Sequence, residues 1–213
     1  MCGRYLIFNE EMNEELEEII ADINRRYPNT NGLNAMATGE VFPTNIAPVM
    51  LPDGPKPMRW GFPPVHQRNR PVINARQETA AASPYFGAAL AQRRIAVPTA
   101  GFYEWMHDEK TKKATDRYRF YLPNEPILYL AGLYSAFTLP NGQKEDRYAI
   151  LTTAANESMA QYHNRMPVYL KKSELGTWMN DAQCVTDILN RPQPRLSASS
   201  VNPKKPVQMS LFG

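Results

Sequence analysis

The chain has 213 residues, of which 43% are hydrophobic, and its 24 Lys+Arg against 21 Asp+Glu give a formal net charge of +3. This composition is typical of a globular protein and excludes an intrinsically disordered one. No apolar run approaches the roughly 18 residues that cross a bilayer. We therefore expect one domain with or without a tail, no membrane association and no secretory signal.

The cysteines and the charge pattern exclude further classes of protein and suggest a class of partner. Two cysteines, Cys2 and Cys184, exclude a four-cysteine zinc site and a disulfide scaffold, so we expect reduced thiols and a cytoplasmic protein, nucleoid-associated if it is bacterial. Residues 1–31 carry seven acids and three bases, which leaves 21 bases and 14 acids for the rest. Residues 54–77 hold five bases and no acid. This stretch fits a nucleic-acid backbone or a solvated loop.

The first predicted elements are a strand over residues 5–8 and an amphipathic helix over 10–27. Apolar side chains recur in the helix at helical spacing. Asn9 is a candidate N-cap, and glutamates crowd the first turns, where the helix dipole favours them. Pro28 is expected to end the helix.

Residues 32–155 have the pattern of short strands separated by Pro- and Gly-rich turns, with Asn141-Gly142 as a hairpin turn. Helical pieces are predicted within 76–92 and over 156–162 and 173–189. The predicted fold class is α+β, with a twisted, mostly antiparallel, barrel-like β-core and short flanking helices. The predicted domain covers 1–190, and residues 191–213, with four bases and no acid, are predicted to be a flexible basic tail. The predicted strands are 47–51, 56–60, 94–98, 102–106, 117–122, 127–134 and 147–153.

Cys2 is the most informative residue for function. Removal of Met1 would leave an α-amine and a thiol on adjacent carbons. An α-amine with a pKa of roughly 7.7–8 is far richer in free base at neutral pH than a lysine. It can condense with an aldehyde, and the thiol can then close a five-membered thiazolidine ring. A 1,2-aminothiol is therefore an aldehyde trap, although Cys2 by itself also fits an incidental small residue.

Three polar clusters accompany Cys2. Asn74 lies in a segment whose polar and apolar residues alternate. Glu104 lies among aromatic residues, where burial would raise its pKa and suit it to general acid catalysis. His163 follows a predicted helix, and a lone histidine is more often structural. His66 and His107 lie in polar surroundings and are weaker candidates.

Together these residues resemble the SOS response-associated peptidase (SRAP) family over roughly residues 2–190. Five motifs occur in the family's order and spacing. They are Met1-Cys2-Gly3-Arg4-Tyr5, Trp60-Gly61-Phe62, Ile73-Asn74-Ala75-Arg76 with Glu78-Thr79, Gly101-Phe102-Tyr103-Glu104-Trp105, and Thr152-Thr153-Ala154-Ala155 followed by His163-Asn164-Arg165-Met166-Pro167.

The resemblance implies an abasic site processing protein of the DNA damage response. It would bond covalently to abasic sites in single-stranded DNA through Cys2, once Met1 is removed by the protein itself or by an aminopeptidase. Asn74 matches the residue that holds the cysteine and the opened sugar. Glu104 matches the carboxylate that moves protons, and His163 the histidine that bonds the sugar oxygen. No metal and no organic cofactor is expected.

The resemblance also implies how DNA is held, in a basic cleft that contains the N-terminus. Arg4 and Arg76 match phosphate-binding arginines, and Arg165 is a further candidate. The sequence departs from the family pattern at Glu40, where many members have asparagine, and at Val65-His66, where some have a tryptophan pair. Base stacking should therefore be weaker or supplied elsewhere. The remaining residues predicted to bind DNA are Trp60, Thr152 and Pro43.

The C-terminal residues resemble the pentapeptide by which bacterial DNA-repair proteins dock on the replication sliding clamp. A polar glutamine and apolar anchors on a flexible tail would fit a surface pocket. The protein itself is expected to be a monomer. The predicted clamp-binding residues are Gln208, Met209, Leu211 and Phe212.

Two other functions stay open. A thiol peptidase would use Cys2, His163 and Asn74 as nucleophile, base and orienting residue, and its action could be limited to its own Met1. A non-covalent reader of modified DNA would bind reversibly, in a salt-sensitive way, and without need of Cys2.

Overall fold

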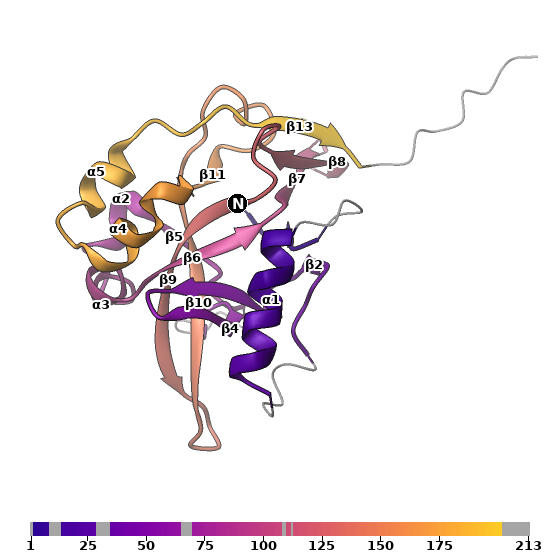
Figure 1. The fold of residues 1–213 in the computed structure, drawn as a ribbon. Coiled ribbons are helices and arrows are strands. Elements are labelled where there is room, and N and C mark those ends of the chain that lie inside the picture. The colour runs from indigo at the N-terminus through magenta and orange to yellow at the C-terminus, as the bar shows by residue number, and fades with distance from the viewer. Residues whose placement is uncertain are drawn as a thin grey trace, which may run out of the picture.

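The computed structural model describes residues 2–8, 14–28, 35–64, 70–107, 110–111 and 113–201 (Figure 1). None of the helices in these ranges is long and apolar enough to cross a membrane. The strands are β1 (Tyr5–Leu6), β2 (Glu40–Val41), β3 (Ile46–Leu51), β4 (Gly54–Trp60), β5 (Asn74–Arg76), β6 (Arg94–Thr99), β7 (Gly101–His107), β8 (Ala114–Tyr121), β9 (Leu128–Thr138), β10 (Lys144–Ala154), β11 (Arg165–Pro167), β12 (Tyr169–Leu170) and β13 (Ser197–Ser200). The helices are α1 (Glu14–Arg26), α2 (Gln77–Ala80), α3 (Gly87–Gln92), a 3-10 turn η1 (Lys172–Glu174), α4 (Leu175–Asn180) and α5 (Val185–Asn190).

A closed ring of five strands forms the centre of the molecule. β3 pairs with β4 and β6, β9 with β6 and β10, and β10 with β4, which closes the ring. Only the β10–β4 contact in the ring is parallel. Apolar side chains from all five strands are buried in the core, and closure leaves the strands of the ring without free edges. The predicted antiparallel, barrel-like core with short helices is confirmed.

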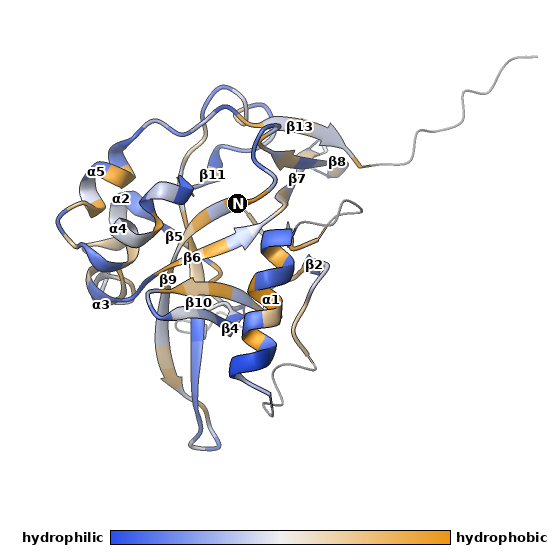
Figure 2. Cartoon of the chain, in the orientation of Figure 1, coloured by the Kyte–Doolittle hydropathy of each residue, from blue (hydrophilic) through white to orange (hydrophobic). Residues whose placement is uncertain are grey.

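Helix α1 covers β3 and β4 with its apolar side, on which Leu16, Ile19 and Ile23 are buried. Figure 2 shows hydrophobic and hydrophilic residues alternating along this helix, as the amphipathic pattern predicted. The short helices α2 to α5 gather on another side of the barrel (Figure 1).

A second sheet, with strand order β13-β8-β7-β1-β2, packs against the barrel. The rings of Tyr5 and Trp60 meet edge to face at 5.2 Å, and Trp60 stacks on Tyr148 at 6.4 Å. The Tyr5 and Tyr148 hydroxyls share a hydrogen bond in the fully buried layer between the two sheets. Three aromatic residues from β1, β4 and β10 therefore fix the position of the N-terminal strand.

Strand alternation gives this second sheet two different faces. The inner face turns toward the barrel and carries Tyr5, Phe102, Glu104, Tyr118 and Phe120, whose positions follow from the pairing register. The outer face carries Arg4, Glu40, Tyr103, Trp105, Arg117, Arg119 and Tyr121.

Two predicted helices are wrong or interrupted. Residues 157–162 form successive turns, and the Asn156 amide donates to the carbonyls of Gln193 and Pro194, which ties the start of this segment to the chain that precedes β13. The predicted helix 173–189 is broken after α4, where the Asp181 carboxylate accepts a bond from the Gln183 N–H. The predicted strands and the hairpin at Asn141-Gly142 are present, and the first residues of the predicted helix 10–27 lie outside the described ranges.

The predicted boundary at residue 190 is also corrected. β13 pairs with β8 from Ser197↔Tyr121 to Ser200↔Tyr118, and Leu196 is buried. Small Ser and Ala side chains at the edge of the sheet let this segment pair although it looks like a linker. The folded part therefore extends to Val201, and residues 202–213, with the predicted clamp-binding motif, lie outside the described residues.

Candidate active site around Cys2

Cys2 lies three residues before β1, and its side chain has no exposed surface. Its Sγ is 3.8 Å from the carbonyl oxygen of Arg4. Burial, and after it the negative charge of Glu104, raises the pKa of the Cys2 thiol to about 12. The thiol therefore keeps its proton at neutral pH.

Asn74 contacts the main chain of Cys2. Its Nδ2 donates to the carbonyl oxygen of Cys2 at 2.9 Å, while its Oδ1 is buried and has no hydrogen-bond partner among the described residues. β5 reaches this position by parallel pairing with β10, and the indole N–H of Trp60 donates to the Ile73 carbonyl beside it. Because a buried unsatisfied acceptor is costly, Oδ1 marks a place where an amine or hydroxyl of a ligand would be stabilised.

Glu104 is the acidic group of the site. It lies on the inner face, opposite Tyr118 of β8, and is 5% exposed. Its charge acts on both Cys2 and His163, since it favours the protonated form of each. A carboxylate in this poorly solvated place is suited to accept and return a proton.

His163 follows the turn that starts at Asn156. Its Nδ1 accepts a hydrogen bond from the Arg165 backbone N–H at 2.9 Å, so the neutral ring carries its proton on Nε2. Burial lowers the pKa of His163 below its ordinary value. The imidazole is therefore neutral at neutral pH and can donate from Nε2.

The structure thus brings together the four residues predicted to be catalytic. They come from the segment before β1, from β5, from β7 and from the segment before β11, and each is linked to a neighbour by contact or charge. A protonated thiol, a carboxylate, a neutral imidazole and an amide can together perform nucleophilic addition with general acid–base assistance. No cluster of three His, Cys, Asp or Glu that could hold a metal occurs among the described residues.

Two of the predicted phosphate-binding arginines are held by carboxylates. Arg4 Nε lies 3.1 Å from Glu40 Oε1. Arg165 makes a bidentate pair with Glu78 at 2.7 and 2.8 Å and donates to the Thr152 carbonyl. Arg76 is exposed at the end of β5.

Other residues predicted to bind DNA are placed differently. Trp60 and Thr152 have no exposed surface, and their side chains bond to the carbonyls of Ile73 and Ala75. We therefore do not include them among the residues proposed to contact DNA, since they support the wall of the site. Pro43 is half-buried in the loop after β2, and Val65-His66 lie outside the described residues.

The basic stretch 54–77 is less positive in the fold than in the sequence. Lys56 pairs with Asp146 at 2.6 Å, and Arg59 pairs with Glu145 at 2.7 Å. β4 lies next to β10, which supplies both acids. Two of the five bases are therefore neutralised by residues about 90 positions away, and Arg68 lies outside the described residues.

Sequence reasoning missed Arg117 and the buried tyrosine pair. Arg117 Nη2 lies 2.8 Å from the same Glu40 oxygen that binds Arg4. The alternation of Arg117, Tyr118, Arg119 and Phe120 could have indicated a basic strand face. No local signal pairs Tyr5 with Tyr148, because 143 positions separate them.

Comparisons with known proteins show the family and the fold of this chain. A family model described as SOS response associated peptidase (SRAP) matches residues 1–205, which includes β13. The abasic site processing protein YoqW of Bacillus subtilis is 31% identical over 204 residues, covering 89% of this chain and 84% of that protein. The abasic site processing protein YedK of Escherichia coli is 30% identical over 123 residues, covering 58% and 54%. A solved structure of a protein from Bacteroides thetaiotaomicron superposes with a TM-score of 0.73 at 22% identity, covering 94% of this chain and 92% of the other, which shows the shared fold.

Proposed function

The chain belongs to the SOS response associated peptidase family, and from that premise we propose that it processes abasic sites in single-stranded DNA by bonding to them through Cys2. The observation that carries the proposal is the position of Cys2, buried against Asn74 and under the charge of Glu104. A relative named as an abasic site processing protein supports DNA as the partner.

The proposed reaction begins with the amine, not the thiol. After removal of Met1, the α-amine of Cys2 adds to the aldehyde of the opened sugar. Loss of water then gives an imine. Since the pKa of the thiol is raised to about 12, a resting thiolate is absent and the amine is the better nucleophile at neutral pH.

The thiol then adds across the imine. The Cys2 sulfur bonds to the imine carbon and its proton ends on the nitrogen, which gives a thiazolidine with all atoms accounted for. In this scheme Glu104 takes the thiol proton and returns it, and His163 donates from Nε2 to the sugar oxygen, which the charge of Glu104 on Cys2 and the tautomer of His163 support. The ring protects the strand, because the aldehyde that drives strand breakage is consumed.

A thiol peptidase acting on other proteins is disfavoured by the same electrostatics. Such an enzyme needs a thiolate beside a protonated histidine. Here burial and Glu104 raise the pKa of the thiol, and burial lowers the pKa of His163, so both groups are neutral. Peptide hydrolysis limited to Met1 stays part of the proposal.

The experiment uses a labelled single-stranded oligonucleotide with one abasic site, incubated with protein whose intact mass shows that Met1 is absent. A heat-stable adduct without added reductant is expected. Cys2→Ala should abolish the adduct, and Cys184→Ala, which removes the other free thiol, should retain it. An adduct with Cys2→Ala would refute the covalent proposal, and binding without any adduct would favour the reader of modified DNA.

Two further parts of the proposal concern partners. Docking of residues 208–212 on a sliding clamp stays a prediction, tested by a pull-down that compares the full chain with residues 1–207. Preference for single strands is tested by placing the same abasic site in a duplex, where slower adduct formation is expected.

A further inference from the structure

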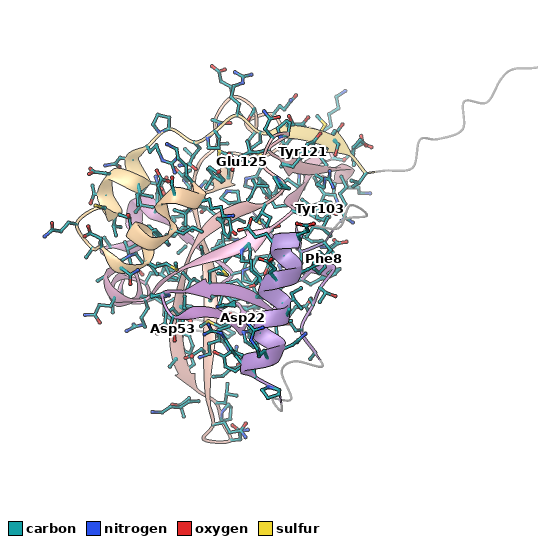
Figure 3. The ribbon with its side chains drawn as sticks, in the orientation of Figure 1. Phe8, Asp22, Asp53, Tyr103, Tyr121 and Glu125 are labelled. Atoms are coloured by element: carbon teal, nitrogen blue, oxygen red, sulfur yellow. The ribbon has the colours of Figure 1, made fainter. Side chains whose placement is uncertain are left out.

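The outer face of the second sheet is a partly exposed surface of arginines and aromatic rings, in which the Tyr103 ring itself is buried. It crosses β2, β1, β7 and β8, and Tyr103 and Tyr121, labelled in Figure 3, mark its β7 and β8 positions. Its side chains alternate with those of the inner face, so it is distinct from the face that carries Glu104, and it begins at Arg4, two residues after Cys2.

Cations and rings alternate across this face. The guanidinium of Arg4 lies 4.0 Å from the centre of the Phe42 ring and 5.1 Å from that of Trp105. The guanidinium of Arg117 lies 3.8 Å from the Tyr103 ring and 5.7 Å from the Trp105 ring. Phe42 is 41% exposed, which is unusual for a large apolar side chain. Surfaces that bind single-stranded nucleic acid combine arginines for the backbone with rings on which bases stack.

Glu40 joins two of these arginines. Its Oε1 lies 3.1 Å from Arg4 Nε and 2.8 Å from Arg117 Nη2. An anionic oxygen between two guanidinium groups is also how a phosphate is held. The three side chains are between 24% and 27% exposed, while the bridging Glu40 Oε1 and Arg4 Nε atoms are buried, so the Glu40 carboxylate has to rotate toward water before another anion can replace it.

We propose that this outer face carries the DNA strand that flanks the abasic site, and that Glu40 occupies the phosphate position between Arg4 and Arg117 until a DNA phosphate displaces it. The inference rests on the proposed function, because it assumes a single-stranded DNA ligand. It adds Arg117 as a DNA-binding residue and makes Glu40 a residue that lowers affinity.

The alternative is that Glu40 only holds the arginines in a productive position. The two explanations predict opposite changes in DNA affinity for Glu40→Gln. If Glu40 competes with phosphate, Glu40→Gln removes the competitor and tightens binding. If Glu40 only positions the arginines, Glu40→Gln weakens binding.

The experiment measures the Kd of an unmodified single-stranded oligonucleotide by fluorescence anisotropy, with all variants in a Cys2→Ala background so that no adduct forms. Glu40→Gln should tighten binding about threefold to tenfold. Arg117→Ala should weaken binding about fivefold to tenfold and reduce the slope of log affinity against log salt by about 0.7, as for one lost phosphate contact. The double variant should lose most of the gain of Glu40→Gln.

Asp22 on α1 offers a matched control. Its carboxylate also joins two arginines, Arg25 at 2.6 Å and Arg26 at 2.8 Å, away from the outer face (Figure 3). Asp22→Asn should change the Kd less than twofold. Arg117→Lys, which keeps the charge, should weaken binding less than Arg117→Ala.

The possible outcomes distinguish a failure of the outer-face inference from a failure of the proposed function. An unchanged Kd with Arg117→Ala, or weaker binding with Glu40→Gln, would overturn the inference while adduct formation by the unsubstituted protein still supports the proposed function. If the unsubstituted protein neither binds the oligonucleotide nor forms an adduct, the proposed function and the inference both fail.

Discussion

Neighbouring residues of β7 lie on opposite faces of the second sheet, and the two faces differ in how well water solvates their charged groups. On β7, Glu104 points inward and is 5% exposed, whereas Trp105 points outward and is half-exposed. On the inner face, poor solvation lets a single carboxylate contribute to a thiol pKa of about 12. On the outer face, the side chains of the Glu40 ion pairs are about one quarter exposed, so water partly screens the pairs and the carboxylate can rotate away in exchange for another anion.

This difference assigns chemistry to the buried face and reversible binding to the half-exposed one. Changes on the inner face should alter rate or stability and leave DNA affinity intact. Changes on the outer face should alter affinity and leave the chemistry intact. A one-residue slip in the pairing of β7 would exchange the two sets of side chains, so the register itself is under functional constraint.

The largest expected effect is that of Glu104→Gln. Removing the group that moves protons should slow adduct formation about 10²-fold to 10⁴-fold, as for loss of a general acid–base. Single-turnover kinetics with the abasic oligonucleotide measure the rate. The Kd for unmodified DNA should change less than twofold, and a wild-type rate would break the assignment of chemistry to the inner face.

A smaller effect is expected for Tyr148→Phe. Tyr5 and Tyr148 are fully buried and share a hydrogen bond, so removing one hydroxyl leaves the other without that partner. The free energy of unfolding should fall by about 1–3 kcal/mol. Urea unfolding measures the loss.

Two further variants sharpen this result. The double variant Tyr5→Phe with Tyr148→Phe should regain part of the lost stability, because neither hydroxyl is then left unsatisfied. Tyr121→Phe on the outer face should change stability by less than about 0.5 kcal/mol. A double variant whose loss equals the sum of the two single losses would contradict the pairing.

The smallest expected effect is on the titration of His163. Burial lowers its pKa, while the negative charge of Glu104 partly opposes this by favouring the imidazolium. The NMR titration midpoint of His163 should therefore lie below 6.5. In Glu104→Gln it should fall further, because the opposing charge is gone. A midpoint above 6.5, or one unmoved by Glu104→Gln, would contradict the inner-face electrostatics.

Much of the fold followed from local pattern. The pattern of short strands between Pro- and Gly-rich turns predicted the strands within residues 46–60, 94–107 and 128–154, and Asn141-Gly142 predicted the hairpin. The errors came from long-range partners. The Asn156 amide donates across to residues 193–194 and holds the start of a segment of turns, and residues 197–200 pair with β8 instead of leaving the domain.

The features of the candidate site were likewise predictable where they depend on local sequence, and not where they depend on distant partners. The spacing of Cys2, Asn74, Glu104 and His163 in motifs was legible in the sequence because each motif is local. Which arginines are neutralised was not legible, since Lys56 and Arg59 lie beside acids of β10 and Arg165 beside Glu78.

By itself, the sequence determined the residue types of the candidate chemistry, the β-rich order of elements and the family. Tertiary structure alone decided that Trp60 and Thr152 are buried, that one oxygen of Glu40 joins Arg4 to Arg117, and that Tyr5 meets Tyr148. The physical reason is the distance along the chain over which each property is determined. Side-chain periodicity is set by neighbours a few residues apart, whereas burial and charge pairing depend on which distant strands become adjacent in the folded chain.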